Sequence, residues 1–199
     1  MTLEDVRAVL EAAARVEPAC ELALRIAAVT GARRAEIAAL RWSDLRGDRL
    51  TIDSSVAVRR DPDRPGKPEL IDAPTKTANS RPVTLDQATI VMIETQRSER
   101  DVVSEYMFSI DAGPPNPDRI GWWWQRARDL AGIDTAWRLH DLRHWSATTA
   151  ITSGHDVRTV AGRLGHANAA MTLRVYAHAV EAADEALAAS LAGALGDEP

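Results

Sequence analysis

Apolar residues recur at helical spacing in the N-terminal part of the chain. Thr2 and Asp5 have the spacing of a capping box, and apolar positions repeat every three or four residues behind them, which predicts a first helix. Pro18 suits the first turn of a second helix, and Gly31 suits its end. A short third helix is expected around Glu36. The chain is therefore predicted to begin with three helices.

The pattern then changes to that of short strands. Alternating and β-branched residues predict strands at 50–53, 55–60, 69–73 and 81–85. Proline, glycine and aspartate in the segment 61–68 predict a turn between the second and the third of them. These strands are expected to form a small antiparallel sheet.

Helical spacing resumes at Asp86, which can cap a helix that reaches about residue 99. Further helices are predicted at 119–131, 139–153, 157–164, 169–177 and 180–195. The pattern indicates an α+β fold, a mostly helical domain with a small three-stranded antiparallel sheet inserted after three helices. Trp122, Trp123 and Trp124 could form a base-stacking surface, but their helical spacing favours the core and its margin.

The composition is typical of a soluble globular chain, with 45% hydrophobic and 27% charged residues. No apolar run approaches the ~20 residues of a membrane span, and the N-terminal residues lack the regions of a signal peptide. We therefore expect a cytoplasmic protein with no membrane partner. Cys20 is the only cysteine and is predicted to be a packed thiol.

The net charge of −5 at first argues against a nucleic-acid partner. Five of the 29 acidic residues lie in 181–199, a segment without Lys or Arg, so the first 180 residues carry 24 acids against 24 bases. A neutral chain can still bind DNA through a local cationic patch.

Five short stretches carry residues suited to chemistry. They are TGARRAE at 30–36, TKTANSRPV at 75–83, HDLRH at 140–144, LGHA at 164–167 and TLRVYAH at 172–178. His140 and Arg143 lie three residues apart and share one face of a predicted helix. Gly165 can end the next helix and leave His166 exposed at its C-terminal end.

In order and spacing, these stretches resemble the motifs of the tyrosine recombinases, also called the phage-integrase family, over about residues 2–178. The resemblance implies an enzyme that breaks and rejoins DNA strands, with Tyr176 as the nucleophile and Glu36 in a supporting role. It assigns the other catalytic positions to two arginines, a lysine and two histidines: Arg33, Arg143, Lys76, His140 and His166. It implies no cofactor and no metal.

The residue types fit this chemistry. A planar, permanently charged arginine can hold two phosphate oxygens, which a lysine cannot do, so two arginines and two imidazoles can stabilise the transition state without a metal. The chain has 22 Arg but only two Lys, Lys67 and Lys76. Lysine can lose a proton near neutral pH if its pKa is lowered, so its retention at Lys76 favours a general acid.

Four further arginines are candidate contacts to DNA phosphates: Arg59, Arg60, Arg64 and Arg81. The first three lie in or beside the predicted turn, where such charges are more often simply solvated. Taken singly, each catalytic candidate also has an ordinary structural explanation, such as a core tyrosine or a histidine at a helix end.

Other interpretations stay open. His140 and His144 have the spacing of a zinc-binding helix, but Asp141 stands where that motif needs Glu, and no third ligand is evident. A DNA-binding regulator of the same fold without catalysis is an alternative, as is a type IB-like topoisomerase.

Residues 1–179 are predicted to form the catalytic domain and 180–199 a tail helix. The tail has one apolar stripe, formed by Val180, Ala183, Leu187, Leu191 and Leu195. This stripe could pack on its own domain or on a neighbouring protomer. The family implies a homotetramer on double-stranded DNA at a specific site, and an N-terminal DNA-clamping domain that we expect to be absent from this chain.

Overall fold

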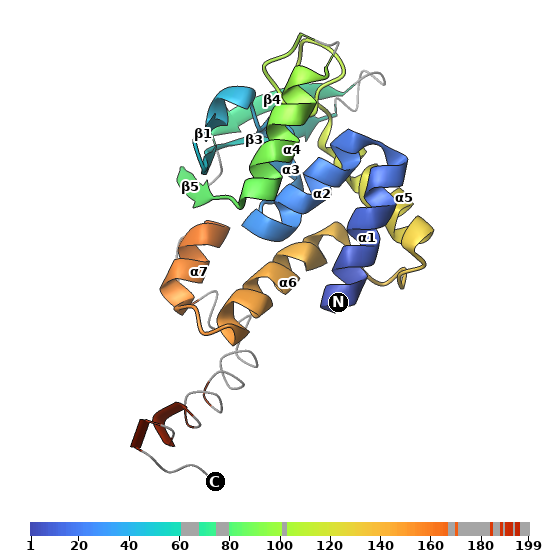
Figure 1. Ribbon diagram of the computed structural model, residues 1–199. Coiled ribbons are helices and arrows are strands. Elements are labelled where there is room, and N and C mark those ends of the chain that lie inside the picture. The colour runs from blue at the N-terminus through green and yellow to red at the C-terminus, as the bar shows by residue number, and fades with distance from the viewer. Residues whose placement is uncertain are drawn as a thin grey trace.

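The computed structural model describes residues 1–60, 68–74, 80–100 and 103–166, together with 170, 184, 188, 190–192 and 194–195. The helices are α1 (Leu3–Val16), α2 (Pro18–Thr30), α3 (Arg34–Ala39), α4 (Gln87–Ser98), α5 (Pro117–Ala131), α6 (Leu139–Thr152) and α7 (Val157–Leu164), with a 3-10 turn at Trp42–Asp44. The strands are β1 (Leu45–Arg46), β2 (Arg49–Ile52), β3 (Ser54–Arg59), β4 (Glu69–Pro74) and β5 (Arg81–Thr84). The predicted α+β architecture is confirmed (Figure 1).

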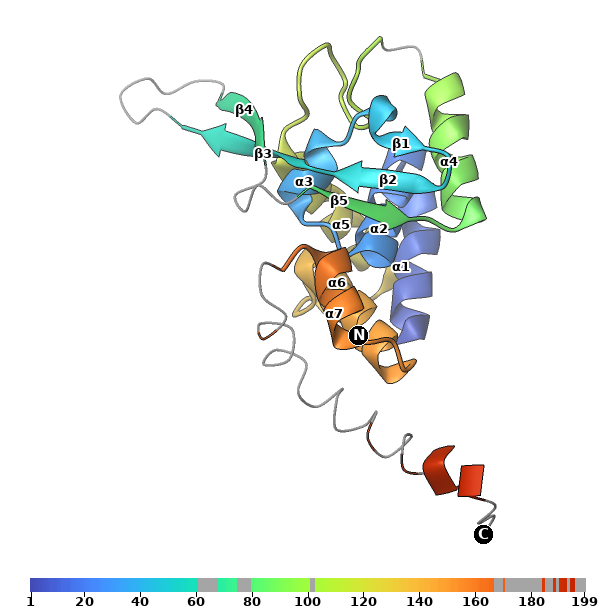
Figure 2. The same ribbon diagram turned by 90° about the vertical axis from the view of Figure 1, so that its left-hand side faces the viewer.

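The strands form two antiparallel sheets. One has three strands in the order β1-β2-β5, and the other is the β3–β4 hairpin. Figure 2 shows this hairpin projecting from the body of the molecule. Strand β1 was not predicted, since two residues are too short to show a periodic pattern. In the first sheet Leu50 pairs with Val83 and Ile52 pairs with Arg81, so Arg81 lies in register with core residues.

Local sequence signals mark helix starts and ends. Thr2 and Asp5 form the capping box of α1. Gly31 ends α2 and Gly165 ends α7, both in the left-handed conformation at φ 66° and 69°. Helix α5 begins at Pro117, two residues before the predicted start, because Asn116 caps it and Pro117 occupies its first turn.

The core lies between α1, α2, α5 and the three-stranded sheet. Trp123 and Trp124 are buried and Trp122 is exposed, which confirms their predicted place in the core and at its margin. Cys20 is also buried, and burial raises the pKa of its thiol to about 12, as expected of a packed and unreactive group. Among the described residues, none of the helices has the length and apolarity that a membrane crossing needs.

Helix α7 is attached to α6 by a small apolar cluster. Ala147 and Ile151 of α6 pack against Val160 and Leu164 of α7, and all four side chains are buried. This cluster fixes the C-terminal end of α7, which carries His166, relative to α6, which carries His140 and Arg143.

The predicted helix at 169–177 lies outside the described residues, apart from the helical residue 170. In the predicted tail helix, 184, 188, 190–192 and 194–195 are described, and all are helical. Leu191 and Leu195 of its apolar stripe are 57% and 80% exposed.

Candidate active site

Arg33 is held at the surface by a buried carboxylate. It precedes α3 in extended conformation, where its backbone N–H donates to Oε2 of Glu36 at 2.8 Å and its Nη1 donates to Oε1 at 3.0 Å. The Glu36 side chain is 3% exposed and that of Arg33 is 43% exposed. Glu36 therefore orients Arg33 while the guanidinium stays accessible to a ligand, as its predicted supporting role requires.

Arg143 joins the two turns that lead into Arg33 and His166. Its side chain is buried on α6, where it donates to the carbonyl oxygen of Gly31 and, at 2.7 Å, to that of Leu164. Each carbonyl lies two residues before one of the predicted catalytic residues. One guanidinium thus fixes Arg33 and His166 relative to the helix that carries His140.

Arg81 forms a second buried link. Its Nη2 donates to Oε2 of Glu36 at 2.6 Å, its Nη1 donates to Oε1 at 3.3 Å, and its Nε donates to the carbonyl oxygen of Arg163 at 3.0 Å. The side chain is 7% exposed. A DNA contact by Arg81 does not fit this placement, because the guanidinium faces protein acceptors. Arg81 and the buried Val83 lie two positions apart on β5, so they share one face of the strand. This spacing is the signal that sequence reasoning overlooked.

The Arg81 link also explains why Gly165 is a glycine. A Cβ at that position would lie 2.7 Å from Nη1 of Arg81, and the backbone φ is +69°. The turn before His166 therefore closes directly onto the Arg81 side chain.

The two predicted catalytic histidines lie in a cationic environment. Burial, together with the charges of Arg143, Arg33 and Arg81, lowers the pKa of His166 to about 4. The pKa of His140 is lowered as well, by burial, by His144 and by Arg143. In the absence of an anion, His166 is therefore neutral at pH 7. A phosphate at this site would favour the protonated form of both imidazoles.

The zinc alternative gains no support from the described residues. His140 and His144 meet edge to face with ring centroids 4.9 Å apart, but no group of three His, Cys, Asp or Glu side chains in the described part is arranged to hold a metal. A metal-free reaction stays a prediction.

Three predicted site residues, Lys76, Tyr176 and Arg64, lie outside the described residues. Arg59 and Arg60 are described, and both are exposed on or beside β3. Arg59 pairs with Glu69 at 3.2 Å, and Arg60 pairs with Asp118 at 3.2 Å. Both are accessible as predicted, although each has an acidic partner that a DNA phosphate would have to displace.

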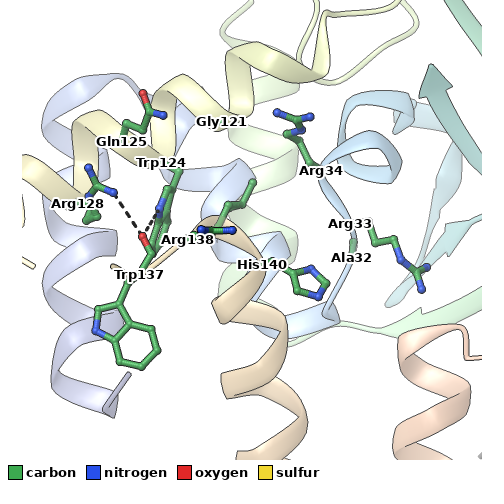
Figure 3. A pocket seen from close by; sticks show the side chains of 11 residues that line it. Ala32, Arg33, Arg34, Gly121, Trp124, Gln125, Arg128, Trp137, Arg138 and His140 are labelled. Carbon is green, nitrogen blue, oxygen red and sulfur yellow. Dashed lines mark hydrogen bonds between the residues drawn. The ribbon is translucent and has the colours of Figure 1, made fainter. Parts of the chain in front are cut away.

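A cavity of about 290 Å³ opens beside Arg33 and His140, between the start of α3, helix α5 and the start of α6. Figure 3 shows Arg33, Arg34, Arg138 and His140 around it. Sequence reasoning missed Arg34, which directly follows Arg33. It also missed Arg138, which lies two positions before His140. The sequence around a single arginine does not show which cavity it lines, because the tertiary position of α5 decides this.

Most of the chain matches a known protein family. Positions 1–182 match the family model described as "Phage integrase family". The chain belongs to this family. An integrase of Mycobacterium phage L5 is 28% identical over 174 residues, which cover 85% of this chain and 46% of that protein. A tyrosine recombinase XerC-like protein of Caldanaerobacter subterraneus is 24% identical, over 76% of this chain and 43% of that protein. The chain thus spans less than half the length of these curated family members.

Solved structures of integrases and recombinases share the fold. The Tn1549 transposon integrase in complex with transposon right end DNA superposes with a TM-score of 0.79 at 18% identity, over 96% of this chain and 65% of that one. The XerA recombinase superposes with a TM-score of 0.68 at 21% identity, over 88% of this chain and 59% of that one. At such identities the match establishes the fold alone.

Proposed function

We propose that this chain contains the catalytic centre of a site-specific DNA recombinase, which cleaves and rejoins DNA strands through a 3′-phosphotyrosyl bond to Tyr176. The observation that carries the proposal is the convergence of Arg33, His140, Arg143 and His166. Arg143, on the helix that carries His140, makes buried hydrogen bonds to the two turns that lead into Arg33 and His166. The family's solved members in complex with DNA, such as the Tn1549 integrase, support DNA as the partner. A cytoplasmic location belongs to the same proposal.

The electrostatics suit a phosphodiester. The non-bridging oxygens gather negative charge in the transition state, and Arg33 presents an accessible guanidinium to them. His140 and His166, neutral without substrate, become donors once an anion raises their pKa. These groups can act without a metal ion or another cofactor.

Tyr176 and Lys76 complete the proposed reaction. The phenol of Tyr176 loses its proton to water, and its oxygen attacks the scissile phosphorus. The attack displaces the 5′-oxygen of the next nucleotide, which leaves with a proton that Lys76 supplies. Forming phenolate at pH 7 costs about 4 kcal/mol at an ordinary tyrosine pKa near ~10, so neighbouring cations are needed to lower that pKa. The ester bond stores the energy for rejoining, when a 5′-hydroxyl attacks and frees Tyr176.

The first test is covalent capture. The chain is incubated with nicked duplexes of random sequence around the nick. DNA that stays attached to the protein after denaturation is then recovered and sequenced. We expect an adduct with a preferred sequence, which also identifies the target. Tyr176→Phe should abolish the adduct. Tyr106→Phe, which changes the only other tyrosine, should retain it.

The outcomes separate the alternatives. Sequence-specific binding without any adduct would indicate a non-catalytic regulator, and an adduct that survives Tyr176→Phe would refute the nucleophile. Relaxation of supercoiled plasmid without strand exchange would favour a type IB-like topoisomerase. Capture should persist in excess EDTA, so activity that only zinc or magnesium restored would favour the metalloenzyme.

The general acid has its own test. Lys76→Ala should slow cleavage of ordinary DNA and be largely rescued when sulfur replaces the 5′-bridging oxygen, since sulfur leaves without a proton. Arg59→Ala is the matched control and should show no selective rescue. Equal slowing on both substrates would mean that Lys76 acts through its charge alone.

Assembly as a homotetramer on two duplexes belongs to the same proposal. The exposure of Leu191 and Leu195 supports docking of the tail on a neighbouring protomer, because an apolar stripe in water gains stability by packing. Truncation after His178 should then weaken multimer formation on DNA and leave the rest folded. Unfolding of the truncated chain would place the tail in its own core, and unchanged assembly would refute docking in trans.

A further inference from the structure

The cavity beside the candidate site is continuous with it. Arg33 and His140 line the cavity and are also two of the residues proposed to act on the scissile phosphate. The remaining wall comes from α5, which contributes Gln125, and from the residues just before α6, which contribute Trp137 and Arg138 (Figure 3). A ligand held at Arg33 and His140 would therefore border this space.

The lining of the cavity is cationic. Arg33, Arg34, Arg128 and Arg138 all contribute to it, and no acidic side chain of the described residues lines it. Arg34 pairs with Asp118 at 3.1 Å outside the lining, and Arg128 pairs with Asp129 at 2.8 Å. A space lined by several guanidinium groups and no carboxylate attracts an anion.

Arg138 differs from the other three arginines. Its backbone N–H donates to Oδ2 of Asp141 at 2.6 Å, but within the described part of the chain its guanidinium has no recorded hydrogen bond or ion pair. The residue is exposed and immediately precedes α6, two positions before His140. Its five N–H donors are therefore available for a ligand at the mouth of the cavity.

The size of the cavity and the apolar part of its lining limit the class of ligand that fits. About 290 Å³ is at the low end for small-molecule sites, and Trp137 and Leu139 add apolar surface beside the guanidinium groups. A sugar with its phosphate combines an anion and an apolar face in a small volume. The strand that places a phosphate at Arg33 and His140 carries another such unit one nucleotide away.

We propose that this cavity is a second phosphate site, which holds the phosphate next to the scissile one on the cleaved strand, with Arg138 as its principal ligand. The proposal rests on the proposed function. Because Arg138, His140 and Arg143 share one helix start, a phosphate bound at Arg138 sets the register of the strand against the catalytic groups.

The test removes the charge from each side of the contact in turn. Binding is measured in the Tyr176→Phe background, with duplexes of the captured target sequence that carry one neutral methylphosphonate. It stands at either neighbour of the scissile phosphate or, as a control, at a phosphate about one helical turn away. Each duplex is tested with Arg138 intact, with Arg138→Gln, and with Arg126→Gln. Arg126 is an exposed arginine of α5 that does not line the cavity, so it controls for loss of one positive charge.

With Arg138 intact, methylphosphonate at one of the two neighbours should weaken binding by about tenfold, as expected for one charge-assisted contact. Arg138→Gln should weaken binding of unmodified DNA by a similar factor and should be insensitive to that methylphosphonate. Arg126→Gln should retain the full sensitivity. The control methylphosphonate should affect all three proteins equally.

If the losses from Arg138→Gln and from methylphosphonate multiply at both neighbours, Arg138 contacts neither phosphate and the second site is refuted. That result is distinct from failure of the proposed function, because the unaltered chain would still form the covalent adduct with the captured sequence. Absence of an adduct in the unaltered chain would overturn the proposed function and this site with it. Thermal unfolding of Arg138→Gln should match the unaltered chain, since the residue is exposed.

Discussion

Two arginine–carboxylate pairs occupy opposite environments in this molecule. Nη2 of Arg81 on β5 lies 2.6 Å from Oε2 of Glu36 on α3, and the two side chains are 7% and 3% exposed. Arg59 and Glu69 lie 3.2 Å apart across the β3–β4 hairpin, with side chains 68% and 61% exposed. The chemical groups are the same, so the difference between the pairs isolates what burial does.

The buried Arg81–Glu36 pair is favourable only when both partners are present. Burial alone would raise the pKa of Glu36, but the hydrogen bond and charge of Arg81, with help from Arg33, hold it below its ordinary value. Removal of one partner leaves a charge with too few hydrogen bonds in a poorly solvated place. On the hairpin, water replaces a lost partner at little cost. The buried contacts of Arg81 beside the candidate site therefore need both partners, whereas the hairpin arginines can exchange partners.

The largest effect is expected from breaking the buried pair. Arg81→Met should destabilise the fold by about 3–5 kcal/mol, because the buried carboxyl group of Glu36 loses its principal partner. Denaturant unfolding measures this loss. A loss below about 1 kcal/mol would mean that the pair behaves like a surface pair and would remove the contrast.

The next effect concerns the glycine that covers Arg81. Gly165→Ala combines left-handed backbone strain of about 1–3 kcal/mol with a Cβ placed 2.9 Å from Cζ of Arg81. Gly132→Ala is the matched control, since Gly132 also ends a helix at φ +68° but has no atom within 4 Å of the added Cβ. Gly165→Ala should cost more in unfolding experiments, and equal costs would show that the Arg81 side chain moves aside freely.

A smaller effect is a pH dependence from His166. Its pKa is lowered from 6.5 to about 4 in the folded chain, so the unfolded chain binds a proton first as the pH falls. Its contribution to stability is complete above pH 6.5 and is lost as the pH falls toward 4. His166→Gln should flatten the stability profile between these values, and the ring signals of His166 in NMR should titrate near pH 4. A midpoint near 6.5 would contradict the cationic environment described for His166.

The smallest effect is expected on the hairpin. Arg59→Ala should change the unfolding free energy by less than about 1 kcal/mol, since its pair with Glu69 is solvated and screened by salt. The same variant should weaken DNA binding only if Arg59 contacts a phosphate, as the sequence predicted. A large loss of stability would show that the hairpin pair is worth as much as the buried one.

Several features of this protein could be predicted from sequence alone because they depend on neighbouring residues. The capping box of Thr2 and Asp5 and the left-handed ends at Gly31 and Gly165 follow from local backbone chemistry. The helical spacing around Trp123 likewise predicted its burial. The family came from motif order, which is also a property of the sequence and matches residues 1–182.

Other features were decided by tertiary structure, because they depend on residues far apart in the chain. The sequence made Arg81 a candidate DNA contact. Pairing of β5 with β2 instead places it against Glu36, 45 residues away in the chain. Arg138 has no distinguishing sequence pattern, and only the approach of α5 gives it a cavity to face. The energy of a charge is set by the water and the partners around it, and the tertiary fold decides both.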